Sequence, residues 1–89
     1  QLRPNYSAAQ YMRGFGKYTT GRLSEAIIDL TSSVEANPYD HKAWNIRGDS
    51  FLRLGKADLA LADFERAIAL DPNNPEYLAD RDKARKAKR

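Results

Sequence analysis

The sequence predicts an all-α protein, a solenoid built from antiparallel pairs of helices. Three observations predict this fold. Apolar residues recur with the three- and four-residue spacing of amphipathic helices. The block 7–40 is repeated without gaps as 41–74. A glycine and a proline recur at the ends of the apolar segments, where each of them stops a helix.

The repeat is carried by identical residues 34 positions apart in the sequence. About two identities are expected by chance between blocks of this length at ordinary amino-acid composition. The two blocks share seven: Ala9/Ala43, Arg13/Arg47, Gly14/Gly48, Gly21/Gly55, Ala26/Ala60, Asp29/Asp63 and Pro38/Pro72. Most of these are small or helix-ending residues, which a packed pair of helices needs.

The first block predicts helices over 7–20 and 23–36. Gly21 ends the first of them, because glycine adopts a left-handed conformation at little cost. Pro38 forbids continuation of the second. The apolar face of the second helix is formed by Leu23, Ala26, Ile27, Leu30 and Val34.

The second block and the remaining chain predict three more helices. Asp40 is a suitable N-cap for the next helix, and Gly55 ends it. Asn74 followed by Pro75 predicts another helix start, with Asn74 as the cap and Pro75 in the first position. The predicted ranges are 41–54, 57–70 and 75–88.

Composition argues against most enzyme classes. The 89 residues include no cysteine and a single histidine, His41. Disulfides and cysteine or histidine-rich metal sites are therefore excluded, and a catalytic triad would have to use His41. His41 lies between Asp40 and Lys42 in the first turn of a predicted helix, which favours a surface or capping role. We expect no enzymatic activity, no cofactor and no metal.

The sequence also shows no clear targeting signal. No stretch approaches the ~18 apolar residues of a membrane-spanning helix. No basic and apolar leader is visible either. The sequence names no compartment, and the cytoplasm is the default expectation.

The second block reads Trp44-x-x-Arg47-Gly48-x-x-Phe51, followed by Ala60-x-x-x-Phe64, Ala67 and Pro72. This pattern resembles the tetratricopeptide repeat (TPR), with Arg47 where an aliphatic residue is usual. The resemblance implies a right-handed TPR-like α-solenoid of five helices. It also implies a division of the chain into an N-terminal extension at 1–6, repeats at 7–40 and 41–74, and a capping helix with a basic end at 75–89.

The resemblance further implies a protein-interaction scaffold. In this family the first helix of each repeat lines a concave groove that receives a peptide or helix of another protein. Aromatic residues and arginine are the usual anchors of such interfaces. The partner-binding positions that it implies are Tyr11, Met12, Phe15, Tyr18, Lys42, Asn45, Asp49 and Arg53. Further groove positions are Ile46, Leu52, Glu76, Ala79 and Asp80.

One subset of the family binds acidic chaperone tails through lysine, arginine and asparagine side chains in the groove. Glu76 and Asp80 stand at two of those positions and would repel a carboxylate-rich tail. The other three positions hold Tyr11, Phe15 and Ile46. We therefore expect that this chain does not bind such tails.

Two features leave alternatives open. The stripe formed by Tyr11, Phe15 and Tyr18 is core or a contact with another repeat, a ligand-binding face, or a surface for self-association into a homo-oligomer. Five basic residues lie within 83–89. They are either a nucleic-acid or anionic-membrane patch, or a solvated helix end whose cations suit the helix dipole. We expect the second, and nucleic acid is an unlikely partner.

Overall fold

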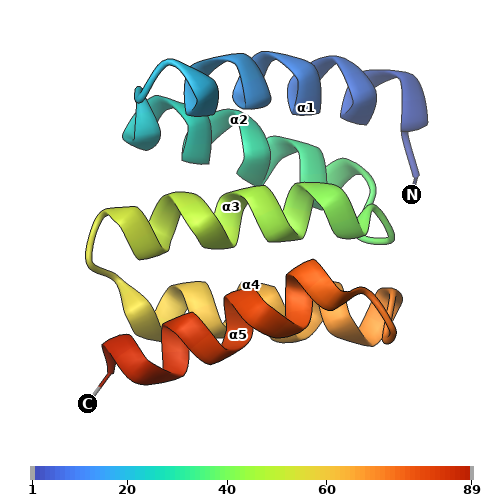
Figure 1. Cartoon of the computed structure of the whole chain (residues 1–89). Helices are drawn as coiled ribbons and strands as arrows, with labels where there is room; N and C mark the ends of the chain where they lie inside the picture. Colours follow the sequence, from blue (N-terminus) through green and yellow to red (C-terminus); the bar gives the residue numbers. More distant parts are fainter. Residues whose placement is uncertain (1, 89) are drawn as a thin grey trace.

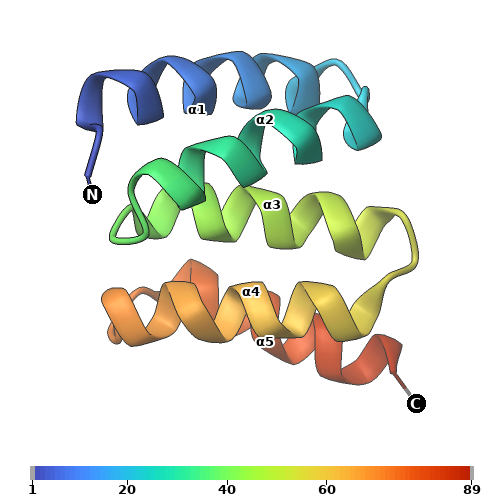
Figure 2. The same ribbon diagram turned by 180° about the vertical axis from the view of Figure 1, so that it is seen from behind.

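The computed structural model describes residues 2–88, which form five helices and no strand. The helices are α1 (Pro4–Thr19), α2 (Leu23–Ala36), α3 (His41–Arg53), α4 (Ala57–Leu70) and α5 (Pro75–Ala87). Figures 1 and 2 show them in two layers, with α1, α3 and α5 side by side in one and α2 and α4 in the other. The predicted all-α solenoid of five helices is confirmed.

The helices form two hairpins, α1–α2 and α3–α4, and the turns inside them have the same backbone conformation and hydrogen bond. Gly21 and Gly55 have φ values of 80° and 79°, which other residues rarely adopt. After Gly21, the Arg22 amide donates to the Lys17 carbonyl at 2.8 Å, and Lys56 repeats this bond to Phe51 at 2.9 Å. These are Schellman ends, and they turn the chain back at the same place in each hairpin.

Side-chain caps start the helices that follow each hairpin. Asp40 accepts from the Lys42 amide at 3.1 Å, and Asn74 accepts from the Glu76 amide at 3.0 Å. The first helix differs from its predicted range, since it begins at Pro4 rather than at residue 7. Proline suits the first helical position because its fixed φ is already helical and it has no amide proton to leave unpaired.

Close helix contact within each hairpin depends on a glycine facing a large apolar residue. A Cβ atom added at Gly14 would lie 2.9 Å from Leu30, and one added at Gly48 would lie 2.8 Å from Phe64. Leu30 and Phe64 are fully buried. The repeat therefore keeps a helix contact too close for any larger residue at the two glycine positions.

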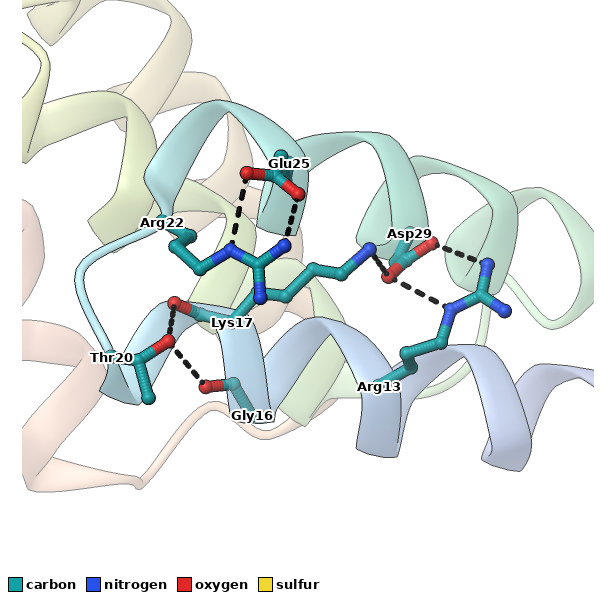
Figure 3. A network of polar contacts seen from close by, with 7 residues as sticks. All are labelled: Arg13, Gly16, Lys17, Thr20, Arg22, Glu25 and Asp29. Atoms are coloured by element: carbon teal, nitrogen blue, oxygen red, sulfur yellow. Dashed lines mark hydrogen bonds and ion pairs between the residues drawn. The ribbon is translucent and has the colours of Figure 1, made fainter.

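An arginine–aspartate pair also recurs in both hairpins. Arg13 donates from Nε and Nη2 to the carboxylate of Asp29 at 3.2 and 2.9 Å, and Lys17 reaches the same carboxylate at 2.9 Å (Figure 3). Arg47 binds Asp63 in the same two-pronged way, at 2.8 Å for both bonds. Each pair fastens the first helix of a hairpin to the second.

Trp44 packs against the loop that joins the two hairpins. The space opposite Gly48 is filled by Phe64 and Asp63, and Trp44 is only half-buried. Its indole Nε1 donates to the Pro38 carbonyl at 2.8 Å. The guanidinium groups of Arg47 and Arg66 lie within 5.1 and 5.3 Å of the Trp44 ring. The indole therefore fastens the loop between the two hairpins.

Two further features are absent from residues 2–88. None of the helices there is long and apolar enough to cross a membrane. Nor do these residues bring three His, Asp or Glu side chains together as metal ligands.

Candidate functional site

The exposed face of α1, α3 and α5 contains two neighbouring hollows of about 210 and 180 Å³. Figure 1 views the molecule from the side of this layer. The larger hollow is lined by Tyr18, Asn45, Ile46, Asp49, Arg53, Glu76, Asp80 and Lys83. The smaller hollow is lined by Tyr11, Lys42, Asn45, Ile46, Glu76 and Tyr77. We call this lined surface the groove.

Three aromatic rings on α1 form a ladder along one edge of the groove. Tyr11, Phe15 and Tyr18 follow the i, i+4, i+7 spacing of a single helix face. Their centroids are 5.9 Å apart between Tyr11 and Phe15 and 6.0 Å between Phe15 and Tyr18, with the ring planes inclined by 20° and 28°. Phe15, in the middle, remains 41% exposed. The ladder is therefore a surface feature with open aromatic area.

The Tyr18 end of the ladder is fixed by polar partners on α3. The Tyr18 hydroxyl donates to the Asp49 carboxylate, and Arg53 Nε donates to the same carboxylate at 2.8 Å. The Arg53 guanidinium lies 5.2 Å from the centroid of the Tyr18 ring. Burial, followed by the hydrogen bond to Asp49, raises the pKa of Tyr18 to about 12. The hydroxyl therefore keeps its proton and acts as a donor at neutral pH.

The Tyr11 end of the ladder lies beside Tyr77 of α5. A hydrogen bond of 2.7 Å joins the Tyr77 hydroxyl to His41 Nδ1, so it links α5 to the start of α3. Burial, followed by the negative charges of Asp71 and Glu76, raises the pKa of Tyr77 to about 12. His41 is thus a positioning partner of Tyr77, and its role extends beyond the surface or capping position expected from the sequence.

Between the two ends, α3 and α5 are joined through amide and carboxylate groups. Asn45 Nδ2 donates to Asp80 at 2.9 Å, and Lys83 reaches Asp80 at 3.9 Å. The Asn45 side chain is almost fully buried by these neighbours. Its amide is therefore committed to holding α5, and its contribution to the groove is mainly to the floor.

The eight implied partner-binding residues fall into two groups. Tyr11, Tyr18, Lys42, Asn45, Asp49 and Arg53 line one or both hollows. Met12 and Phe15 line neither, but both are exposed on α1, and Met12 is 72% exposed. Leu52, a further groove position in the sequence reading, packs instead against the buried cluster of Ala60, Phe64 and Ala84.

Sequence reasoning missed two groove residues, Tyr77 and Lys83. Both belong to the last helix, where the family resemblance assigned only Glu76, Ala79 and Asp80 to the groove. The spacing of Tyr77 and Ala84, seven residues apart, is a usable signal. Both are buried on one face of α5, as the seven-residue spacing of two helical turns requires.

His41 and the buried serines make structural contacts. His41 is bonded to Tyr77 rather than to a serine. The buried serines serve structure, since the Ser7 and Ser33 side chains bond each other and Ser50 donates to the Ile46 carbonyl. The exposed rings and charged side chains are suited to hold another molecule.

Comparisons with known proteins match this geometry. A sequence profile described as tetratricopeptide repeat matches residues 11–75. A solved structure described as the first TPR of Spaghetti (RPAP3) bound to HSP90 peptide SRMEEVD superimposes with a TM-score of 0.94 at 25% identity. That match covers 99% of this chain and 70% of the other.

Curated relatives contain similar segments within much longer proteins. The cytochrome c-type biogenesis protein CycH of Bradyrhizobium diazoefficiens is 29% identical over 76 residues, which are 85% of this chain and 21% of that protein. The Hsp70-Hsp90 organizing protein of Triticum aestivum is 38% identical over 66 residues, which are 74% of this chain and 11% of that protein. The chain thus spans about a fifth or less of the length of these relatives.

Proposed function

We propose that this chain, which belongs to the tetratricopeptide repeat family, is a non-enzymatic scaffold that receives a peptide or helix of a partner protein in the groove of α1, α3 and α5. Domains of the family are generally interaction modules without catalytic activity, and the fold of this chain is that of the family. The observation that carries the proposal is the exposed aromatic ladder beside two hollows.

The ladder supplies the binding energy in this proposal. Large aromatic side chains dominate interface energetics because they bury much apolar area with few rotatable bonds. Phe15 is held between Tyr11 and Tyr18 and is still exposed, so a ligand would find it already oriented. Met12 is also exposed on α1 and extends this apolar surface with an adaptable side chain.

The polar residues of α3 supply orientation. Lys42 is exposed at the smaller hollow, while Asp49 and Arg53 hold the larger one through their mutual ion pair. Groups of this kind fix the register and direction of a peptide more than its affinity. The proposed contact set is Tyr11, Met12, Phe15, Tyr18, Lys42, Asn45, Asp49 and Arg53.

The related RPAP3 domain supports this proposal, because its structure holds a peptide and its fold covers nearly all of this chain. That peptide is a ligand of the related domain. For this chain it supports the class of ligand, a short protein segment.

A random peptide library displayed on phage and selected on the immobilised chain tests the proposal. We expect selected peptides to lose about tenfold or more in affinity with Phe15→Ala, because an anchoring ring is removed. The matched control is Ile28→Ala on α2, which removes a side chain that is 67% exposed in the other layer. Equal affinity for the two variants would contradict the proposal, as would a stable dimer whose formation depends on Phe15 and whose groove takes no peptide.

A further inference from the structure

We propose that the Tyr11 end of the groove receives a basic side chain, an arginine or lysine of the bound segment, over the Tyr11 ring and beside the Glu76 carboxylate. This inference rests on the proposed function, since it names the chemistry of the segment that the groove holds. The occupant is a peptide segment with at least one such cation.

The Tyr18 end of the ladder shows how the groove holds a guanidinium. Arg53 lies over the Tyr18 ring at 5.2 Å, bonds the Asp49 carboxylate at 2.8 Å and reaches the Tyr18 hydroxyl at 3.3 Å. The receptor therefore consists of an aromatic face and a carboxylate, supplied by neighbouring helices. A cation gains from both, because the ring face and the carboxylate are negative.

The Tyr11 end has the same two groups without a resident guanidinium. Tyr11 and Glu76 line the smaller hollow, which has a volume of about 180 Å³. Among residues 2–88, Glu76 takes part in no ion pair, and no cation–π contact involves Tyr11. The ladder thus has one occupied and one open place for a cation.

Charge near this open place is negative. Burial comes first in raising the pKa of Tyr11, and the negative charges of Asp40 and Glu76 raise it further. The same two carboxylates contribute to the raised pKa of Tyr77 across the hollow. A local potential that disfavours a phenolate favours a cation. Lys42 and Glu76 are the charged side chains that line this hollow, and Asp40 adds a second negative charge nearby.

An acidic segment finds fewer matching groups. Arg53 and Lys83 line the larger hollow, but each is engaged, with Asp49 and Asp80 respectively. Lys42 remains for a carboxylate, and Glu76 lies in the same hollow. The peptide bound to the related RPAP3 domain, SRMEEVD, contains three acidic residues. Charge complementarity therefore favours a basic segment in this groove.

The phage-selected peptides provide the probe. One peptide whose binding depends on Phe15 is synthesised with acetylated and amidated ends, together with a copy in which its arginine is replaced by citrulline, a neutral isostere. We expect arginine or lysine to be enriched among the selected peptides, and citrulline to weaken binding by about tenfold. Glu76→Gln is expected to weaken the arginine peptide by about two- to fivefold and Glu76→Lys by about tenfold.

Glu65→Lys is the matched control, because it makes the same charge change at an exposed residue of α4 that lines neither hollow. Circular dichroism melting establishes that each variant is folded. Selected peptides that need Phe15 but carry no basic residue, or that bind equally well to Glu76→Lys and Glu65→Lys, would overturn the inference and leave the proposed function intact. A library that yields no Phe15-dependent peptide would overturn the proposed function itself.

Discussion

The Arg13–Asp29 pair of the first hairpin and the Arg47–Asp63 pair of the second have the same place in the repeat and different surroundings. Arg13 lies at the outer edge with 63% of its side chain exposed, whereas Arg47 lies between the hairpins with 18% exposed. Arg47 also donates to Thr31 of the preceding hairpin at 3.2 Å. The central arginine therefore joins three helices, and the edge arginine joins two.

The pKa values of the two carboxylates shift in opposite directions on folding. The hydrogen bond from Arg13 lowers the pKa of Asp29, and Lys17 adds to the effect. Burial raises the pKa of Asp63, although Arg47 partly opposes it. The same residue types at equivalent positions thus have opposite pKa shifts, because pairing with Arg13 and Lys17 outweighs burial at Asp29, whereas burial outweighs pairing with Arg47 at Asp63.

The groove faces of the hairpins differ as well. The first hairpin contributes the aromatic ladder of α1, and the second contributes the polar residues Asn45, Asp49 and Arg53 of α3. Residues that hold the hairpins together are repeated, while residues that face the groove are not. In the proposed function, recognition would therefore depend on positions that differ between the two repeats.

The largest expected effect comes from truncating the residue opposite each glycine. Phe64→Ala is expected to lower the free energy of unfolding by about 3–5 kcal/mol. Leu30→Ala is expected to lower it by about 2–5 kcal/mol. We expect the loss for Leu30→Ala to be the smaller of the two, because Phe64 also packs against Ala84 of α5. Denaturant unfolding followed by circular dichroism measures both values.

Phe64→Leu keeps this comparison measurable if Phe64→Ala does not fold. It retains most of the apolar volume, and we expect an intermediate loss. A larger loss for Leu30→Ala than for Phe64→Ala would contradict this expected order.

A smaller effect is expected from removing each arginine. Arg47→Ala leaves the buried Asp63 carboxylate without its partner and is expected to cost about 2–4 kcal/mol. Arg13→Ala is expected to cost clearly less, because Arg13 is exposed and Lys17 still holds Asp29. Equal losses in denaturant unfolding would refute the contrast between edge and centre.

The smallest effect concerns pH. The pKa of Asp29 is lower in the folded state, so its stabilisation is present above the ordinary aspartate value of about 3.9 and is lost as the pH falls through the folded value. The pKa of Asp63 is raised on folding, so its contribution is present below the unfolded value and is lost as the pH rises through the folded value.

The two asparagine variants separate these contributions. Asp29→Asn is expected to flatten the loss of stability on acidification, and Asp63→Asn is expected to steepen it. Unfolding free energies measured at a series of pH values between neutral and acid provide the test. If the slope of unfolding free energy against pH changes in the same direction for both variants, the opposite pKa shifts of Asp29 and Asp63 are contradicted.

The sequence predicts the helices and their ends well, because the repeated residues there act through their own backbone conformation or on residues close by in the chain. Gly21 and Gly55 end helices through their own backbone conformation. Asp40 caps the next helix by accepting a hydrogen bond from the backbone amide two residues later. The arginine and the aspartate of each pair are identical between the two repeats and lie 16 residues apart in both. The sequence alone does not predict that they bind each other. Their pairing depends on two helices packing at a fixed rotation.

The groove is harder to predict because its residues are brought together from three helices. The stripe on α1 follows from helical spacing, but its burial does not, since Phe15 is exposed while Tyr11 and Tyr18 are half-buried. The burial of Asn45 and the bond between His41 and Tyr77 depend on how α5 packs on α3. No local pattern encodes that contact, so the sequence did not predict that Asn45 binds α5 or that Tyr77 lines the groove.

Backbone amide NMR of the chain, titrated with a phage-selected peptide, tests most directly whether the groove is the receiving surface. We expect the largest chemical-shift changes at residues that line the hollows, such as Tyr11, Asn45 and Glu76. Shifts concentrated on the opposite layer, around Ile28 of α2 and Leu59 of α4, would contradict the assignment of the groove.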